Sequence, residues 1–99
     1  GAFLYSSGKY LEAADSYRKA LEIAPGHFDA TVNLALTEIK LGAFDRAVPL
    51  ARQAVQLRPR SGLAHYYLGL ALRGSGMASE AQQAFQQAQQ LDPNLRVPP

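Results

Sequence analysis

Hydrophobic residues recur at steps of three and four positions along most of the chain, which is the period of an amphipathic helix. Polar residues fill the intervening positions. No stretch alternates apolar and polar residues between turn residues in the manner of a β-strand. The period therefore predicts an all-α protein, with residues 1–7 as the end of one helix and further helices over about 10–24, 28–41, 45–57, 62–73 and 80–91.

Glycine and proline mark the expected ends of these helices. Gly8 and Gly42 are predicted to end the helices before them, because glycine takes the left-handed backbone conformation at the least cost. Residues 74–76, Gly-Ser-Gly, are predicted to form another turn. The remaining helices end at prolines, which cannot continue a helix: Pro25, Pro59 and Pro93.

Several polar residues are expected to start helices. Asp45 and Ser61 are suitable N-cap residues for the helices that follow them. Ser79, with a glutamine three positions later, is predicted to form a capping box. Pro49 follows Asp45 closely, and a proline is tolerated only in the first turn of a helix. We therefore expect a late start or a distorted first turn for the helix of residues 45–57.

The same residue types return at a spacing of 34 positions. Glycine stands at positions 8, 42 and 76, alanine at 13, 47 and 81 and again at 20, 54 and 88, and proline at 25, 59 and 93. Such a fixed spacing without insertions indicates a repeat array. It predicts one domain over 1–99, with a repeat over about 1–27 that is truncated at its start, repeats over about 28–61 and 62–95, and a tail over 96–99.

Composition narrows the functional classes. Hydrophobic residues make up 47% of the chain, which is ordinary for a folded protein. The absence of cysteine excludes disulfides and thiolate metal sites, and a net charge of +2 is too small to indicate nucleic acid or an anionic membrane as a partner. No apolar run is long enough to span a bilayer, and no signal peptide is recognisable. Because the chain starts at Gly1, we expect an excised fragment whose compartment is unknown, with the cytoplasm as the default.

No motif of a catalytic site is found. The chain has no glycine-rich phosphate loop, nucleophile elbow or His-Glu-x-x-His sequence. Its two histidines, His27 and His65, are isolated in the sequence, which favours structural roles over metal binding. The sequence therefore predicts a protein that is not an enzyme and has no cofactor or metal.

The charged residues are interpreted mainly as solvated helix faces. Asp15 precedes Lys19 at helical spacing, and Glu38 is expected near Lys40 on an exposed face. A small basic cluster is predicted away from any groove and has no aromatic residue interleaved, so RNA or phosphate binding there is only a minor alternative. This cluster consists of Arg52, Arg58 and Arg60.

The repeated positions resemble the tetratricopeptide repeat (TPR) family, whose motif is roughly W-x2-L-G-x2-Y, then A-x3-F, then A and P. The third repeat carries this resemblance through Leu68, Gly69, Leu72, Ala81, Phe85, Ala88 and Pro93. Thr31 and His65 occupy the tryptophan site, and Glu38 stands at the usual tyrosine site. The resemblance implies antiparallel helix-turn-helix repeats stacked as a right-handed α-solenoid, with a scaffold role.

In TPR proteins the first helix of each pair lines a concave groove that receives a peptide or a partner helix. The resemblance places on this face Tyr5, Asp29, Val32, Asn33, Leu36, Lys40, Leu63, Tyr66, Tyr67, Leu70 and Arg73. Asn33 resembles the groove asparagine that holds a ligand backbone. Tyr66 and Tyr67 are expected to provide rigid apolar contact area, with core packing as their alternative. Lys40 and Arg73 are positioned to meet acidic groups.

Chaperone-binding TPR domains surround a C-terminal carboxylate with lysine, arginine and asparagine side chains. Of the corresponding positions only Asn33 fits, because Leu63 and Tyr67 stand where cations are required, so a chaperone tail is disfavoured. The groove is more apolar than charged, which favours an extended apolar peptide or an amphipathic helix. The leading hypothesis is a non-catalytic protein-interaction scaffold. The alternative is a self-assembly module that forms a homo-oligomer through its open repeat ends.

Overall fold

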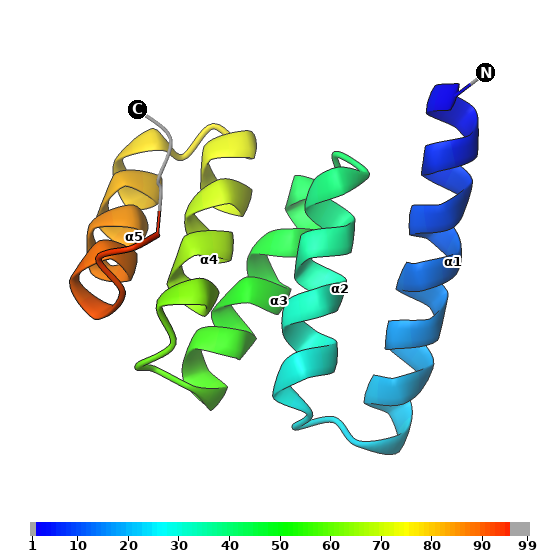
Figure 1. The fold of residues 1–99 in the computed structure, drawn as a ribbon, viewed down its shortest axis with the longest axis horizontal. Coiled ribbons are helices and arrows are strands. Elements are labelled where there is room, and N and C mark those ends of the chain that lie inside the picture. The colour runs from blue at the N-terminus through cyan, green and yellow to red at the C-terminus, as the bar shows by residue number, and fades with distance from the viewer. Residues whose placement is uncertain (1, 96–99) are drawn as a thin grey trace.

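The computed structural model describes the backbone of residues 2–95 and the side chains of residues 8–95. This part of the chain contains helices and no strand (Figure 1). The helices are α1 (Ala2–Ile23), α2 (Phe28–Lys40), α3 (Phe44–Leu57), α4 (Gly62–Gly74) and α5 (Ala78–Leu91). The predicted all-α class is confirmed.

Consecutive helices pack against one another, and α2 also contacts α4. Figure 1 shows α2 and α4 running in the same direction, with α1 at one edge of the array and α5 at the other. The helices therefore form two layers, with α2 and α4 in one and α3 and α5 in the other. This arrangement is an α-solenoid built from antiparallel helix pairs.

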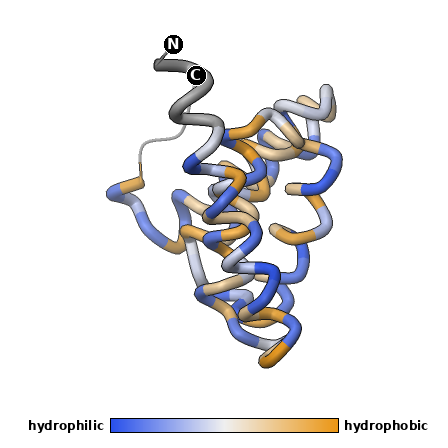
Figure 2. The backbone as a smooth tube through the Cα atoms, turned by 90° about the vertical axis from the view of Figure 1, so that its right-hand side faces the viewer, coloured by the Kyte–Doolittle hydropathy of each residue, from blue (hydrophilic) through white to orange (hydrophobic). Residues whose placement is uncertain are grey.

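The core between the layers is built largely from small side chains. Four alanines of the 34-residue pattern, at positions 47, 54, 81 and 88, are at most 2% exposed. Larger side chains fill the space around them, including Leu34, Leu72 and Phe85. Hydrophilic and hydrophobic stretches alternate along the coloured part of the backbone tube in Figure 2, as expected for helices that turn one side to the core. These small side chains allow the paired helices to approach closely.

The turns at Gly42 and Gly76 have the same geometry. Both glycines are left-handed, with φ of 76° and 84°. At the first turn the Ala43 N–H donates to the Glu38 carbonyl at 2.8 Å, and the Gly42 N–H donates to the Ile39 carbonyl at 3.0 Å. This pair of bonds is a Schellman motif, and it is repeated at Gly76. The predicted helix ends at these two glycines are confirmed.

Gly8 stands at the equivalent position of the first repeat but does not end a helix, so this prediction is wrong. It lies inside α1, and its backbone is not left-handed. At the other two turns, α3 packs back on α2 and α5 packs back on α4. The backbone of residues 2–7 is already helical, and α1 runs through Gly8 without a turn. Continuing the helix through glycine costs only about 1 kcal/mol relative to alanine.

The continuous helix makes a testable prediction for Gly8→Ala. A Cβ atom at Gly8 would meet nothing within 4 Å. The substitution should therefore raise the free energy of unfolding by about 0.5–1 kcal/mol, because alanine is the better helix former. Urea denaturation measures this change, with Gly42→Ala as the matched control that should be destabilising. If Gly8→Ala destabilises the protein as much as Gly42→Ala does, the predicted continuous helix is wrong and Gly8 forms a turn.

One of the predicted N-caps is confirmed and the others are wrong. The Ser61 hydroxyl accepts a hydrogen bond from the Ala64 N–H at 3.2 Å and caps α4. Asp45 and Ser79 lie in the first turns of α3 and α5, because the residue directly after each turn glycine is already the N-cap. The late start expected from Pro49 is also absent. Pro49 lies within α3 and is exposed to solvent, so the helix continues through it without the one backbone hydrogen bond that a proline cannot donate.

Candidate binding face

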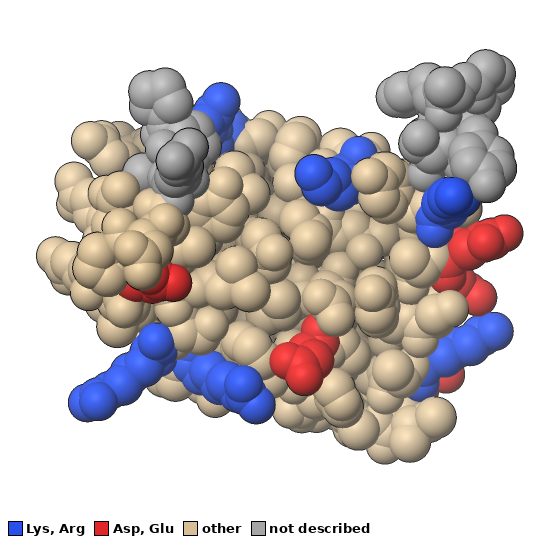
Figure 3. Space-filling view, viewed as in Figure 1, with Lys and Arg blue, Asp and Glu red and all other residues tan. Residues whose placement is uncertain are grey.

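Helices α2 and α4 lie side by side and form one broad surface (Figures 1 and 3). Most of the side chains predicted for the groove lie on these helices and retain solvent exposure. We call this surface the α2–α4 face, and we define it by Asp29, Asn33, Leu36, Lys40, Leu63, Tyr66, Tyr67, Leu70 and Arg73. The side chain of Tyr5 lies outside the described residues.

Val32 does not belong to this face, although the sequence placed it there. Its side chain is 4% exposed and packs in the core with Ala54 and Ala64. Helices α3 and α4 both contact α2, and together they cover the side of α2 from which Val32 projects. The packing of the repeats against one another therefore buries Val32.

Two adjacent tyrosines form the centre of the α2–α4 face. The ring centroids of Tyr66 and Tyr67 are 5.8 Å apart, and the rings are tilted by 57°. Tyr66 also lies 5.9 Å from the ring of Phe85 in α5. Tyr67 packs against the core cluster that contains Val32. Each tyrosine is thus half-buried, with its base held by the core and part of its ring open to solvent.

The environment of Tyr67 keeps its hydroxyl protonated. Burial raises the pKa of the Tyr67 phenol above its ordinary value of 10.0, and the neighbouring Tyr66 raises this pKa further. Within the described part of the chain, neither tyrosine hydroxyl is hydrogen-bonded. The Tyr67 hydroxyl therefore remains a neutral donor and acceptor at physiological pH.

The α2–α4 face also carries Asn33 and three leucines. Asn33 is exposed on α2, and its side-chain amide makes no hydrogen bond with any described residue. Leu36 and Leu70 are half-buried, and Leu63 is 41% exposed. The centre of the face thus offers apolar area together with polar groups that have no partner within the described residues.

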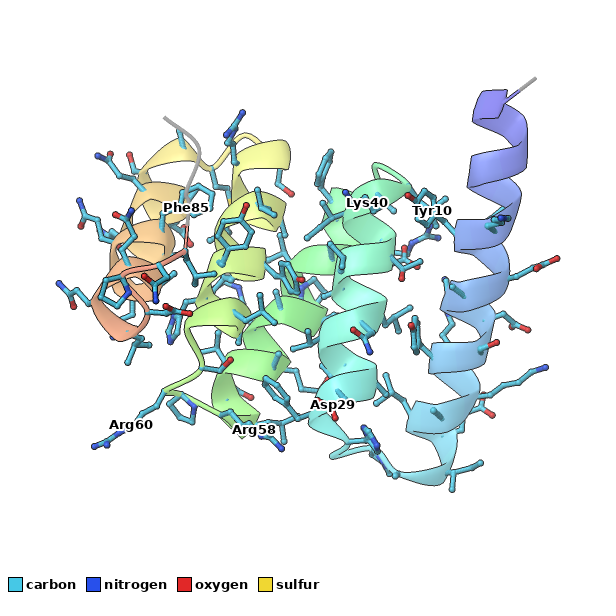
Figure 4. The ribbon with its side chains drawn as sticks, viewed as in Figure 1. Tyr10, Asp29, Lys40, Arg58, Arg60 and Phe85 are labelled. Carbon is cyan, nitrogen blue, oxygen red and sulfur yellow. The ribbon has the colours of Figure 1, made fainter. Side chains whose placement is uncertain are left out.

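Charged side chains lie at the ends of the face and not at its centre. Figure 4 shows Asp29 near the start of α2 and Lys40 at its end, and Figure 3 shows an uncharged surface between them. Arg58 lies close to Asp29 in Figure 4, and its guanidinium carbon is 4.3 Å from the centroid of the Phe28 ring.

The position of Arg58 corrects the expectation that the basic cluster lies away from the groove. Arg58 borders two hollows at the end of the α2–α4 face. One hollow has a volume of about 350 Å³ and is lined by Leu57, Arg58 and residues 26–29. The other has a volume of about 640 Å³ and is lined by residues 58–61. Arg52 points elsewhere and bonds Glu80 at 3.1 Å. The 34-residue register alone did not reveal the contact of Arg58 with Phe28.

Glu38 is also placed differently from the prediction. Its side chain is 1% exposed and accepts bonds from Arg18 Nη2 at 2.8 Å and from Arg46 Nε at 2.7 Å. These bonds join α1, α2 and α3. Leu72 occupies the equivalent position 34 residues later and is 2% exposed, so this position points inward in both repeats. The predicted pair of Asp15 with Lys19 is confirmed at 3.4 Å.

The histidines make local contacts only. His27 Nδ1 accepts a hydrogen bond from the Ala30 N–H at 3.1 Å and caps α2. His65 Nε2 lies 2.9 Å from the Pro59 carbonyl oxygen. Among residues 8–95 no group of three or more potential metal-ligating side chains is found. None of the helices in the described range has the length and apolar character needed to cross a membrane.

The stacked antiparallel helix pairs define a helical-repeat protein, and comparison with known families specifies which one. A family described as tetratricopeptide repeat matches residues 32–95, and a second family of the same description matches residues 4–48. The chain therefore belongs to the tetratricopeptide repeat family.

Known proteins agree with this assignment. Small glutamine-rich tetratricopeptide repeat-containing protein 2 of Mycosarcoma maydis is 35% identical over 92 residues, covering 93% of this chain and 26% of that protein. The structure of MamA from Desulfovibrio magneticus is 31% identical with a TM-score of 0.83, covering 91% of this chain and 51% of MamA. Thermobaculum terrenum O-GlcNAc transferase is 32% identical with a TM-score of 0.83, over 89% of this chain and 17% of the transferase.

These relatives are all longer than the part that matches. The chain spans about a quarter of the fungal relative and about half of the MamA structure. Relatives in this family are protein-interaction scaffolds that bind protein partners and are generally not enzymes, although the transferase is an enzyme by its name.

Proposed function

We propose that this chain is a non-catalytic interaction module that binds a segment of a partner protein on the α2–α4 face. The observation that carries this proposal is the centre of the face. There, half-buried tyrosines and leucines lie beside an exposed asparagine, and none of their side-chain polar groups is hydrogen-bonded within the described residues. Such a surface combines apolar area with unsatisfied donors and acceptors, as binding sites for peptides do.

The two tyrosines are suited to dominate the binding energy. Tyrosine presents a large rigid surface at a low cost in conformational entropy, and it is enriched among the residues that contribute most at interfaces. Tyr66 and Tyr67 are held from below by Phe85 and by the core cluster of Val32. A partner would therefore meet side chains that are already in place.

The polar groups of the face favour an extended partner segment over a helix. An extended backbone leaves N–H and C=O groups that need partners, whereas a helix satisfies its own. The Asn33 amide both donates and accepts hydrogen bonds, and the tyrosine hydroxyls do the same. Leu63 and Tyr67 supply no positive charge, so a terminal carboxylate is not the feature that this face would recognise.

A peptide array screened with the purified chain tests the proposal. Selected peptides should bind Tyr67→Ala and Leu70→Ala at least about tenfold more weakly, because each substitution removes apolar contact at the centre of the face. Gln83→Ala and Gln86→Ala on the exposed side of α5 are matched controls that should bind normally. Circular dichroism checks that every variant is folded. Equal binding by Tyr67→Ala and the unchanged chain would contradict the proposal.

A second candidate function is self-assembly through α1. Leu11 is 55% exposed and Ile23 is 87% exposed on this edge helix. The other edge, α5, instead exposes its glutamines. Light scattering over a concentration series should show a dimer that is weakened by Leu11→Ser but not by Tyr67→Ala. A dimer weakened by Tyr67→Ala would make the α2–α4 face the assembly interface, and a monomer at all concentrations would contradict self-assembly.

A further inference from the structure

Eight of the nine described lysines and arginines fall into two groups, according to whether they form an ion pair. Those that pair with a carboxylate are Arg18, Lys19, Arg46 and Arg52. Those that make no ion pair with any described residue are Lys40, Arg58, Arg60 and Arg73. Lys9 has an interaction within the protein and belongs to neither group. The four cations without an ion pair are therefore available to an external partner.

These four cations lie at the two ends of the α2–α4 face. Lys40 is the last residue of α2, and Arg73 is the last residue but one of α4. Because α2 and α4 run in the same direction, both lie at the end that carries the glycine turns (Figure 1). Arg58 and Arg60 precede α4 and lie at the opposite end (Figure 4). Basic side chains thus flank the uncharged centre on both sides.

The nearby carboxylates do not form ion pairs with these cations. Asp29 lines the same hollow as Arg58, and Asp92 lies next to Gly62 at the start of α4. Among the described residues, neither carboxylate is bonded to Arg58 or Arg60. Glu38 is close to Lys40 in sequence, but it is buried and held by Arg18 and Arg46. The four cations at the two ends of the face therefore have no ion-pair partner among the described residues.

The side chain of Arg58 is also held in position by a neighbouring aromatic ring. Its guanidinium lies over the Phe28 ring at 4.3 Å, and a cation held on an aromatic face loses less side-chain freedom when it meets an acidic group. The hollows that Arg58 borders leave space beside it for a carboxylate side chain.

We infer that the partner is an extended segment with an apolar centre and acidic residues on both sides. This inference rests on the proposed function of the α2–α4 face. Helix α2 has 13 residues and is about 20 Å long. An extended chain rises about 3.3 Å per residue, so about six residues connect the two basic ends. The acidic flanks would speed association and select among apolar segments.

Three pools of blocked, fluorescent peptides test this inference. Each pool has about four central positions randomised among apolar and aromatic residues. The pools are flanked on both sides by two glutamates, two glutamines or two lysines. We expect the glutamate pool to bind the purified chain about tenfold more tightly than the glutamine pool at low salt. This advantage should shrink as ionic strength rises from about 0.05 M to about 0.5 M.

Charge variants test which cations cause the tighter binding of the glutamate pool. The double variants Lys40→Gln/Arg73→Gln and Arg58→Gln/Arg60→Gln should each remove most of the advantage of the glutamate pool. The matched control, Lys19→Gln/Arg52→Gln, removes two cations from elsewhere and should retain the advantage. Thermal denaturation checks that all three variants are folded. If the control variant loses the advantage of the glutamate pool to the same extent, the inference is overturned.

The remaining outcomes separate this inference from the proposed function. If all pools bind alike and Tyr67→Ala abolishes binding, the face binds apolar segments, but the inferred preference for acidic flanking residues is wrong. If the lysine pool binds best, the inference is overturned in the same way. If no pool binds, both the inference and the proposed peptide site fail. If the peptide gains a helical circular dichroism signal on binding, the inference that the bound segment is extended is overturned.

Discussion

The double variant Arg18→Ala/Arg46→Ala should lower the free energy of unfolding by about 3–5 kcal/mol. The Glu38 carboxylate is 1% exposed, and these two arginines are its ion-pair partners. Without them a buried negative charge has nothing to compensate its lost hydration. Urea denaturation measures the effect, which should correspond to a fall in Tm of at least about 12 °C in a domain of this size.

Two controls show whether the cost comes from the buried charge. Adding Glu38→Leu to the double variant should recover most of the lost stability, because an apolar side chain needs no ion-pair partner. Arg52→Ala breaks the pair with Glu80, in which both side chains are at least 50% exposed, and should cost less than about 1 kcal/mol. A double variant that costs no more than Arg52→Ala would contradict the prediction.

Phe85→Ala should lower the free energy of unfolding by about 3–5 kcal/mol, as expected for a large buried aromatic residue. Phe85 is 7% exposed and packs in one core cluster with Leu72, Ala81 and Ala84. Figure 4 shows it between α4 and α5. Its ring also supports Tyr66, so the variant should weaken peptide binding as well. Thermal denaturation and a binding titration with one selected peptide measure the two effects.

The close approach of α4 to this ring provides the complementary test. A Cβ atom at Gly69 would lie 2.5 Å from Cε1 of Phe85, so Gly69→Ala should cost about 1–3 kcal/mol. In a Phe85→Leu background the same change should cost less, because the shorter side chain leaves room. Gly26→Ala is the control, since a Cβ there meets nothing within 4 Å. An equal cost of Gly69→Ala in both backgrounds would contradict the predicted clash.

Local patterns in the sequence were sufficient to predict the helical class, the repeat and most of the exposed residues of the α2–α4 face. Hydrophobic periodicity located the helices, since the period follows from the geometry of a single helix. The 34-residue spacing located Gly42 and Gly76, whose left-handed turns are local structures. The same register placed Asn33 and Tyr67 on one face, because residues 34 positions apart occupy equivalent positions in successive repeats.

Other features depended on contacts between helices. Gly8 has the same local sequence signal as Gly42, but it lies inside α1 and is not left-handed, whereas the turn at Gly42 lets α3 pack back on α2. Val32 is covered by neighbouring helices, whereas Asn33 beside it is exposed. Whether a helical position faces a partner or the core is decided by which helices pack there.

The ion pairs show most clearly which features the sequence pattern could not predict. Glu38 was expected to lie near Lys40, yet it is buried between two arginines from other helices. Arg58 was expected to lie away from the groove, yet it contacts Phe28 from a turn 30 positions later in the chain. Helical spacing determines which residues share a face of one helix. Ion pairs between helices, and the cations they leave unpaired, are determined only when the helices stack.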